Sequence, residues 1–399
     1  MDSRLNAPPR YRFLRQRVWR QALIIGTILI SALLYVVVAA AIQSRMDRWT
    51  HFSDLLIPRS IDVIVAAWLF YIGSSIGSFL NVVAWRMPRG VSINGRSHCP
   101  SCNTTLSMKD NWPVLGWLAL AGRCRTCHLP ISPRYPIVET CVGVCIAMVA
   151  WVEIYHGGDN LPFRDSLAKP IEVSMTTVTT ESIIIAVFHA AAIAMSWAMG
   201  LVRFDNHRLP PRMVIFGFAI TIVPMLANPT LAIVPWQVDI LPTYRADGRH
   251  LDAVMRVITG AVAGVVIARS LSRCFSPTAD PKMNPLGDGT KRMMDTAAML
   301  CIPGIIVGWQ AIIAVTVLAV SITLVWRRLA RTTADPFTQF AVALPIALTV
   351  NLYLWRQTTA VVWWPSVGTP PMVTTAWAAL ILILPLALRS RPTAPDEGV

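Results

Sequence analysis

Four cysteines form the pattern with the clearest chemistry in this sequence. Cys99 and Cys102 make one C-x-x-C pair, and Cys124 and Cys127 make a second pair after 21 intervening residues. Four thiolates with this spacing are typical of a tetrahedral Zn²⁺ site, and a complete set of four cysteines leaves no open position, so the metal would be structural. Two disulfides are the alternative, and zinc is favoured if the loop is cytoplasmic, where thiols stay reduced.

The chain around these cysteines is strongly apolar. Hydrophobic residues make up 54% of the 399 residues and charged residues only 14%, whereas soluble domains carry about 25% charged residues. Apolar segments long enough for a ~30 Å hydrocarbon core recur, so the sequence predicts an all-α polytopic membrane protein with about ten transmembrane helices and a cytoplasmic four-cysteine zinc loop. The predicted spans are 22–43, 61–85, 136–155, 182–202, 213–235, 251–271, 294–308, 309–326, 339–356 and 372–389.

The distribution of the basic residues predicts the orientation. The net charge is +14, yet no Lys/Arg stripe interleaved with aromatic residues is present, so we expect no nucleic-acid partner. If 294–326 is a hairpin broken near Pro303 and Gly308, the Arg-rich loops all fall on one side. This arrangement places both termini and residues 86–135 in the cytoplasm. The first span is longer than the ~7–15 residues of a signal-peptide core, so an uncleaved anchor is favoured over a signal peptide.

Several short segments flanking the cysteines are specific in sequence. Residues 77–88 read GSFLNVVAWRMP, residues 110–115 read DNWPVL, and residues 134–139 read RYPIVE. These segments resemble the type IV prepilin peptidase family, and residues 73–145 carry most of the resemblance. Weaker matches occur at Arg208-Leu209-Pro210, at Gly308-Trp309-Gln310 and at Asp335-Pro336-Phe337.

The resemblance implies a function, a cofactor and partners. It implies a bacterial inner-membrane aspartic peptidase that cleaves leader peptides from type IV prepilin or type II secretion pseudopilin precursors. It also implies N-methylation of the product with S-adenosylmethionine. The domains would be 1–60, an extension with an extra helix; 61–155, the zinc-loop, methyltransferase-like region; 156–356, the peptidase-like region; and 357–399, an extra helix and a disordered tail.

The family's two catalytic aspartates are altered in this chain. The resemblance aligns the first with Arg203, and Asp205 follows two residues later. Counting back from Gly308 places the second at Thr296, with Asp295 adjacent and no G-x-G-D before it. If the protein cleaves precursors, we expect Asp205 and Asp295 to share a proton as base and acid. Asp288, in Gly287-Asp288-Gly289, lies too far upstream without an insertion.

Two other functions compete with an active peptidase. One is a catalytically reduced relative that binds or stabilises prepilin precursors without cleaving them, which Arg203 and the missing G-x-G-D favour. The other is a transporter, which predicts ionisable residues at midspan and paired repeats. His189 and Arg256 are the few midspan candidates, and no internal repeat is visible.

Overall fold

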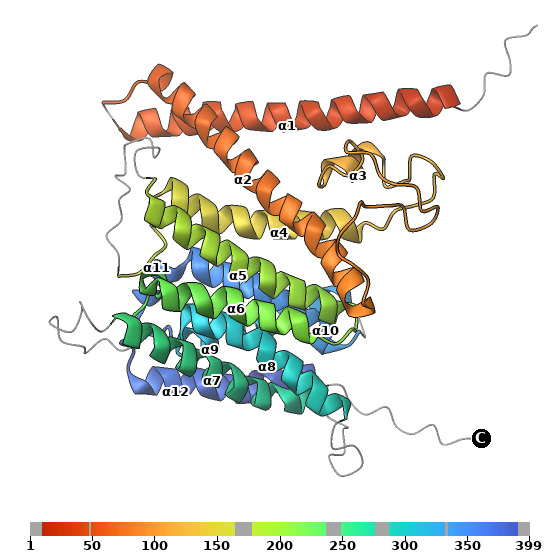
Figure 1. The fold of residues 1–399 in the computed structure, drawn as a ribbon. Coiled ribbons are helices and arrows are strands. Elements are labelled where there is room, and N and C mark those ends of the chain that lie inside the picture. Colours follow the sequence, from red (N-terminus) through yellow and green to blue (C-terminus); the bar gives the residue numbers. More distant parts are fainter. Residues whose placement is uncertain are drawn as a thin grey trace, which may run out of the picture. The chain divides into compact units, whose positions relative to one another are not determined.

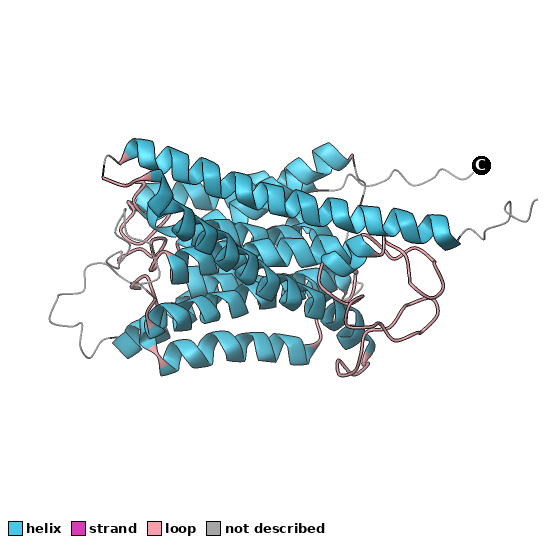
Figure 2. Cartoon of the chain, turned by 90° about the horizontal axis from the view of Figure 1, so that it is seen from above, coloured by secondary structure: helices cyan, strands magenta, loops and turns pink. Residues whose placement is uncertain are grey.

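The computed structural model describes residues 10–47, 49–163, 178–236, 249–275, 287–331 and 334–389. These residues are almost entirely helical (Figure 1), and Figure 2 shows that the loops lie at the helix ends. Within the described ranges the β-structure consists of two isolated bridges in the cysteine loop. The predicted all-α class is confirmed. The chain forms two compact units, residues 1–82 with 94–147, and residues 83–93 with 148–399.

The first unit contains the cysteine loop and the helices that hold it. Glycines let helices α2 and α4 approach closely, because a Cβ at Gly77 would lie only 2.9 Å from the Cα of Glu139. Helices α1 and α2 are joined by Arg59, which donates to Asp62 at 2.7 Å and also to Gln43. The helices of this unit are α1 (Arg10–Met46), α2 (Phe52–Arg86), α3 (Leu115–Ala119) and α4 (Arg134–Ala150). The last residues of α2 and of α4 belong to the second unit.

The second unit is a helical bundle with an apolar core. Helices α7 and α8 pack closely in it, because Gly260 faces Gly304 and a Cβ at Gly264 would lie 2.8 Å from the nitrogen of Cys301. The close approach that small residues such as Gly260 and Gly264 allow is therefore realised here. Its elements are η1 (Met87–Arg89), a π-helical turn η2 (Trp151–Tyr155), α5 (Thr180–Phe204), α6 (Pro211–Ala227), η4 (Pro229–Leu231), α7 (Arg249–Phe275), α8 (Asp288–Val307), α9 (Ala311–Ala330), α10 (Pro336–Tyr353), α11 (Trp355–Thr359), α12 (Pro371–Ile383) and η6 (Leu384–Leu388).

Each of the ten predicted spans overlaps one main helix, and four of them also run into a short element that follows it (η2, η4, α11 or η6). The protein is a multi-pass membrane protein. In the described part of the chain, eight helices are long and apolar enough to cross a membrane; α6 is shorter, and α8 is outside that set. The prediction for 213–235 is too long, because the helix contains Pro224 and ends at Ala227, before Asn228 and Pro229. The predicted break near 308 is confirmed, since Gly308 has a φ of 91° and separates α8 from α9.

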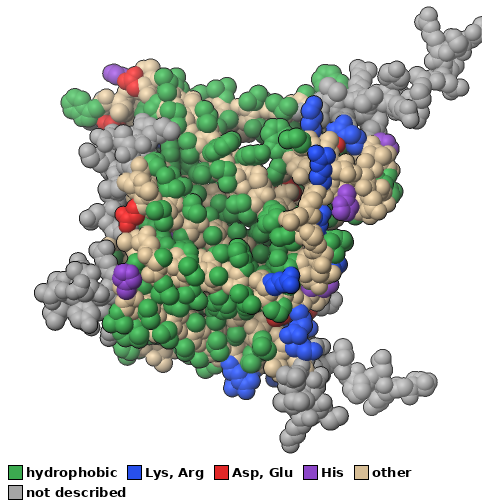
Figure 3. Space-filling view, in the orientation of Figure 1, with side chains coloured by type: hydrophobic (Ala, Val, Ile, Leu, Met, Phe, Trp, Pro, Cys, Tyr) green, Lys and Arg blue, Asp and Glu red, His purple; other side chains and the backbone are tan. Residues whose placement is uncertain are grey.

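The surface of the second unit has separate apolar and basic zones. Hydrophobic side chains cover the length of its helices, whereas Lys and Arg gather where α7 ends and α8 begins (Figure 3). This pattern agrees with the basic loop predicted there, although residues 276–286 lie outside the described residues, as does the tail after Arg389.

Candidate functional site

The four predicted cysteines converge in the first unit. Their Sγ atoms all lie within 4.8 Å of one another, and Cys99–Cys127 and Cys102–Cys124 are each separated by 3.9 Å. A tetrahedron of sulfurs around Zn²⁺ at about 2.3 Å has edges of about 3.8 Å, which these separations match. They are far longer than the ~2.05 Å of a disulfide bond. The donor set and its geometry therefore fit one tetrahedral metal ion with thiolate ligands.

Two similar backbone turns present the sulfurs. In the first, the N–H of Cys99 donates to Thr104 O, and that of Asn103 donates to Cys99 O, both at 2.9 Å. In the second, the N–H of Cys124 donates to Leu129 O at 2.9 Å, and that of His128 donates to Cys124 O at 3.1 Å. Asn103 and His128 occupy the same place in the two turns and have positive φ values of 55° and 60°. The C-x-x-C spacing is thus built into two matching turns.

Local hydrogen bonds favour the ionised form of two thiols. The side chain and backbone of Thr104 lower the pKa of Cys102 to about 6, whereas burial and the neighbouring thiols of Cys102, Cys124 and Cys99 raise the pKa of Cys127 to about 11. Backbone hydrogen bonds from Cys127 and Thr126 lower the pKa of Cys124, and the Thr126 N–H donates to its sulfur across 3.4 Å between N and Sγ. Thiolate is the form that binds metal.

The segment between the knuckles is tied to the second knuckle and to α4. The guanidinium Nε of Arg125 donates to Asp110 Oδ2 at 2.8 Å. Val114 has φ 59° and ψ −56°, and the N–H of Leu115 donates to Pro113 O, which defines a γ-turn. This turn is rare and strained, and the β-branched Val114 makes it more so. The Val114 N–H donates to Glu139 Oε2 at 2.7 Å, so a buried carboxylate from α4 holds the strained turn.

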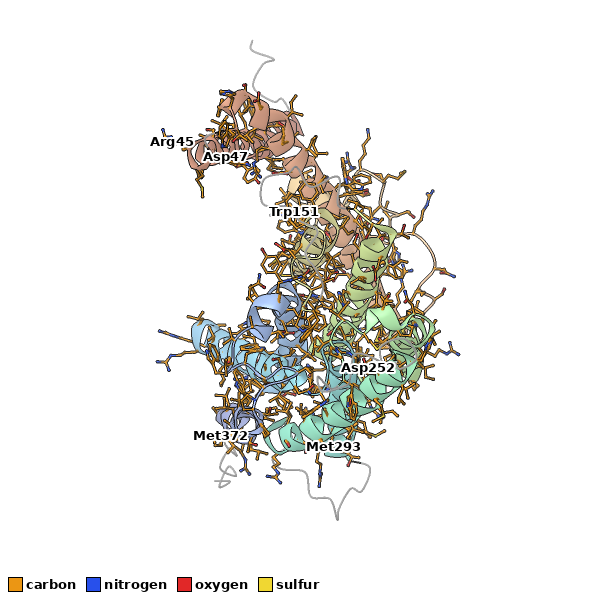
Figure 4. The ribbon with its side chains drawn as sticks, turned by 90° about the vertical axis from the view of Figure 1, so that its left-hand side faces the viewer. Arg45, Asp47, Trp151, Asp252, Met293 and Met372 are labelled. Atoms are coloured by element: carbon orange, nitrogen blue, oxygen red, sulfur yellow. The ribbon has the colours of Figure 1, made fainter. Side chains whose placement is uncertain are left out.

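A second polar cluster lies at the end of α5 in the second unit. Arg203 Nη1 lies 3.2 Å from Asp295 Oδ2, and both side chains are buried. The guanidinium of Arg203 also donates to His207 O at 2.8 Å and lies 4.6 Å from the ring centre of Phe337. Met293, labelled in Figure 4, marks the turn of α8 before Asp295.

The structure separates the environments of the two predicted catalytic aspartates. Asp295 is 5% exposed and carries Arg203 as its ion-pair partner on α5. Asp205 is the half-buried C-cap residue of α5, with its N–H donating to Leu201 O at 3.1 Å. Asp288 is the first residue of α8. The resemblance implies an aspartate at position 203, but this chain has Arg203 there, and its guanidinium pairs with Asp295.

The cysteine loop with its flanking helices is similar to a known type of domain. Residues 71–153 match the model of the Bacterial Peptidase A24 N-terminal domain. This segment contains both knuckles, the Val114 turn and Glu139. The resemblance of this segment to the prepilin peptidase family, predicted from residues 73–145, is thereby confirmed.

Curated relatives of this segment are prepilin-processing proteins. A "Prepilin leader peptidase/N-methyltransferase" of Myxococcus xanthus is 44% identical over 107 residues, 26% of this chain and 31% of the relative. A "Type 4 prepilin-like proteins leader peptide-processing enzyme" of Escherichia coli is 42% identical over 102 residues, 20% of this chain and 38% of the relative. A "Prepilin leader peptidase/N-methyltransferase" of Klebsiella pneumoniae is 39% identical over 93 residues, 22% of this chain and 41% of the relative.

The matches cover part of each protein. This chain spans between 31% and 41% of the length of those three relatives. No solved structure matches the chain. The similarity therefore establishes what residues 71–153 resemble, and the activity of the whole chain is a proposal.

Proposed function

We propose that this protein acts on type IV prepilin-like precursors at the cytoplasmic face of the bacterial inner membrane. The observation that carries the proposal is the segment at residues 71–153, which is similar in sequence to relatives named for prepilin processing. This segment contains the thiol cluster and the turn bound by Glu139. The family resemblance implies that the precursors of type II secretion pseudopilins are also substrates, and the proposal includes them.

The cofactors follow from different kinds of support. Zn²⁺ fits the four thiolates of Cys99, Cys102, Cys124 and Cys127, where it would fix the fold of the loop and take no part in a reaction step. S-adenosylmethionine rests on the resemblance and on relatives named N-methyltransferases. Residues 61–155 are the region that we assign to methylation, and residues 156–356 are the region that we assign to cleavage.

Cleavage of a leader peptide by this chain would use Asp205 and Asp295. One carboxylate takes a proton from the attacking water, and the other gives a proton to the departing amide nitrogen. The pair must hold one proton between them, which two carboxylates do when they lie close together without a cation. Arg203 already compensates the charge of Asp295, so the present arrangement favours slow cleavage.

A second candidate function follows from the same ion pair. A protein whose second carboxylate is held by Arg203 can bind or stabilise a precursor without cleaving the leader. This candidate keeps precursor binding and removes the peptidase step. It is the catalytically reduced homologue considered from the sequence.

Membranes containing only this protein, mixed with a prepilin, separate the candidates. Leader removal is measured as a gel shift, and methyl transfer from labelled S-adenosylmethionine is measured on a pilin that is already cleaved. If Asp205 and Asp295 cleave, Asp205→Asn and Asp295→Asn abolish the shift while Asp288→Asn keeps it. Loss of cleavage only in Asp288→Asn would show that the Gly287–Gly289 segment is the active one.

Arg203→Asp is the sharpest variant. It places a second carboxylate at the position where the family has one, and we expect it to create or speed leader removal. A wild-type protein that binds prepilin and never cleaves it, together with a cleaving Arg203→Asp variant, supports the second candidate. A protein that neither binds, cleaves nor methylates any prepilin contradicts the proposed function as a whole.

A further inference from the structure

A buried ionisable pair occupies the second unit, remote from the Arg203–Asp295 cluster. Glu153, on the π-helical turn that begins at Trp151 (labelled in Figure 4), places Oε1 2.6 Å from His189 Nδ1 on α5. His189 precedes Arg203 by 14 residues, which is about 21 Å along a helix axis. Glu153 and His189 are 0% exposed.

A third polar residue joins the pair to α10. The Asn160 amide nitrogen donates to Glu153 Oε1 at 3.1 Å and to Leu352 O at 2.8 Å, and Asn160 is also 0% exposed. The carbonyl of Asn160 accepts the backbone N–H of Arg356 at 2.8 Å. The cluster therefore connects the π-helical turn, α5, and the end of α10.

The remaining polar atoms of the cluster lack partners among the described residues. Glu153 Oε2, His189 Nε2 and Asn160 Oδ1 are buried and have no hydrogen-bond partner there. Because Oε1 of Glu153 accepts from His189, the proton of a neutral imidazole lies on Nδ1, and Nε2 is then an acceptor. Three buried acceptors without a donor indicate a ligand that brings hydrogen or positive charge.

The charge balance leads to the same kind of ligand. An ionised Glu153 beside a neutral His189 is a single negative charge in an apolar interior, which is strongly unfavourable unless a positive charge accompanies it. The cations nearby in sequence are engaged elsewhere: the guanidinium of Arg356 donates to the carbonyl of Asp159 at 2.8 Å. The ring of His156 packs at a tilt against Trp151 and edge-on against Tyr155.

The packed helices add no further cation at this level of the described structure. Apart from His189, the ionisable residues of α5 are Glu181 in its first turn and Arg203 in its last. Helix α10 contributes Tyr353 as its sole titratable residue, and Asn351 of α10 is buried with both amide atoms unpartnered. The single negative charge is thus left for a ligand to balance.

We propose that Glu153, His189 and Asn160 form an intramembrane site for one monovalent positive charge. The charge is either a proton, carried on His189 Nε2, or a small alkali cation held by Glu153 Oε2 and Asn160 Oδ1. Oxygen ligands suit hard cations of this kind. Since Asn160 links the π-helical turn to α10, binding of the charge stabilises this junction of the unit.

Thermal unfolding of the full-length protein in detergent distinguishes the two sources. In a choline buffer free of alkali ions, the melting temperature is measured across the ordinary titration range of histidine, around pH 6.5. NaCl then replaces choline chloride at constant ionic strength and at a pH above that range. The variants are Glu153→Gln and Asn160→Ala, with Glu181→Gln as a matched control at an exposed glutamate of α5.

A ligand that binds only the folded protein raises the melting temperature, because it lowers the free energy of the folded state and leaves the unfolded state unchanged. Sodium-dependent stabilisation of wild type and Glu181→Gln that is absent in Glu153→Gln assigns an alkali cation. Stabilisation by acid alone, absent in Glu153→Gln, assigns a proton. If Glu153→Gln does not fold, the carboxylate and imidazole bands of wild type in difference infrared spectra give the same answer. The proposal is overturned if neither sodium nor acid changes the melting temperature in a way that depends on Glu153.

Discussion

Replacement of Glu139 tests whether α4 holds the strained turn of the cysteine loop. The Glu139→Leu variant removes the carboxylate that accepts the Val114 N–H at 2.7 Å. A hydrogen bond to a charged group contributes about 1.5–3 kcal/mol, and the γ-turn stores strain of about 1–3 kcal/mol that favours its opening. The loss of the carboxylate therefore raises the open population of this segment by roughly 10- to 150-fold, at 1.36 kcal/mol for each factor of ten.

Native-state hydrogen exchange of the segment measures this change. The probes are the amides of Gly116 and Leu118, which donate to Trp112 O at 2.8 Å and to Val114 O at 3.1 Å. Glu139→Gln is the matched control, because its side-chain oxygen still accepts the N–H as a neutral group, and we expect roughly a 10-fold acceleration at most. Zinc content stays at the wild-type level in both variants. Equal exchange in wild type and Glu139→Leu would refute the role given to this carboxylate.

Three further predictions concern the metal, the orientation and the packing. Purified protein should contain one zinc ion per chain; Cys124→Ser should lose it, and His128→Ala, outside the thiol cluster, should keep it. Elemental analysis decides, and unchanged zinc in Cys124→Ser rules the site out. Reporter fusions at residues 120 and 245 should report opposite compartments, and the same compartment for both breaks the ten-span topology. Gly260→Val introduces a side chain against Gly304 and should lower the free energy of unfolding of the bundle by about 1–3 kcal/mol or more. The melting temperature should fall, and an unchanged melting temperature would contradict the observed contact.

The thiol cluster could be predicted because its information is local. Two C-x-x-C pairs carry their own turn geometry, and the structure realises it with matching hydrogen bonds at Cys99 and Cys124. The helices were predictable for a related reason, since each apolar run specifies a span without reference to the others. The exception is the end of α6, where Pro224 lies inside the helix and the chain leaves it at Asn228.

The roles of the buried carboxylates could not be predicted in this way. In the sequence, Glu139 is only the last residue of the RYPIVE segment; the structure buries its side chain and pairs it with the backbone N–H of Val114, 25 residues away. His189 was recognisable as a midspan residue, but its partner Glu153 is 36 residues away, and Asn160 contacts Leu352 at a separation of 192 residues. A backbone donor exposed by a turn, or a helix end brought near by packing, leaves no pattern in the sequence.

The Arg203–Asp295 pair changes the net charge of the ionised cluster in the peptidase-like region, and this affects whether a carboxyl group there holds a proton. Around Phe337, Arg203 and Asp295 form one pair, and Arg292 forms another with Asp335 at 2.7 Å. Four ionised groups in two pairs are neutral without any bound proton, so nothing here requires a carboxyl group to stay protonated. With aspartate at position 203, the same four groups carry three carboxylates and one guanidinium. Two adjacent carboxylates then avoid mutual repulsion by sharing a proton, which is the condition for acid–base catalysis. This is why cleavage by Arg203→Asp tests the proposed chemistry more directly than the loss of either aspartate.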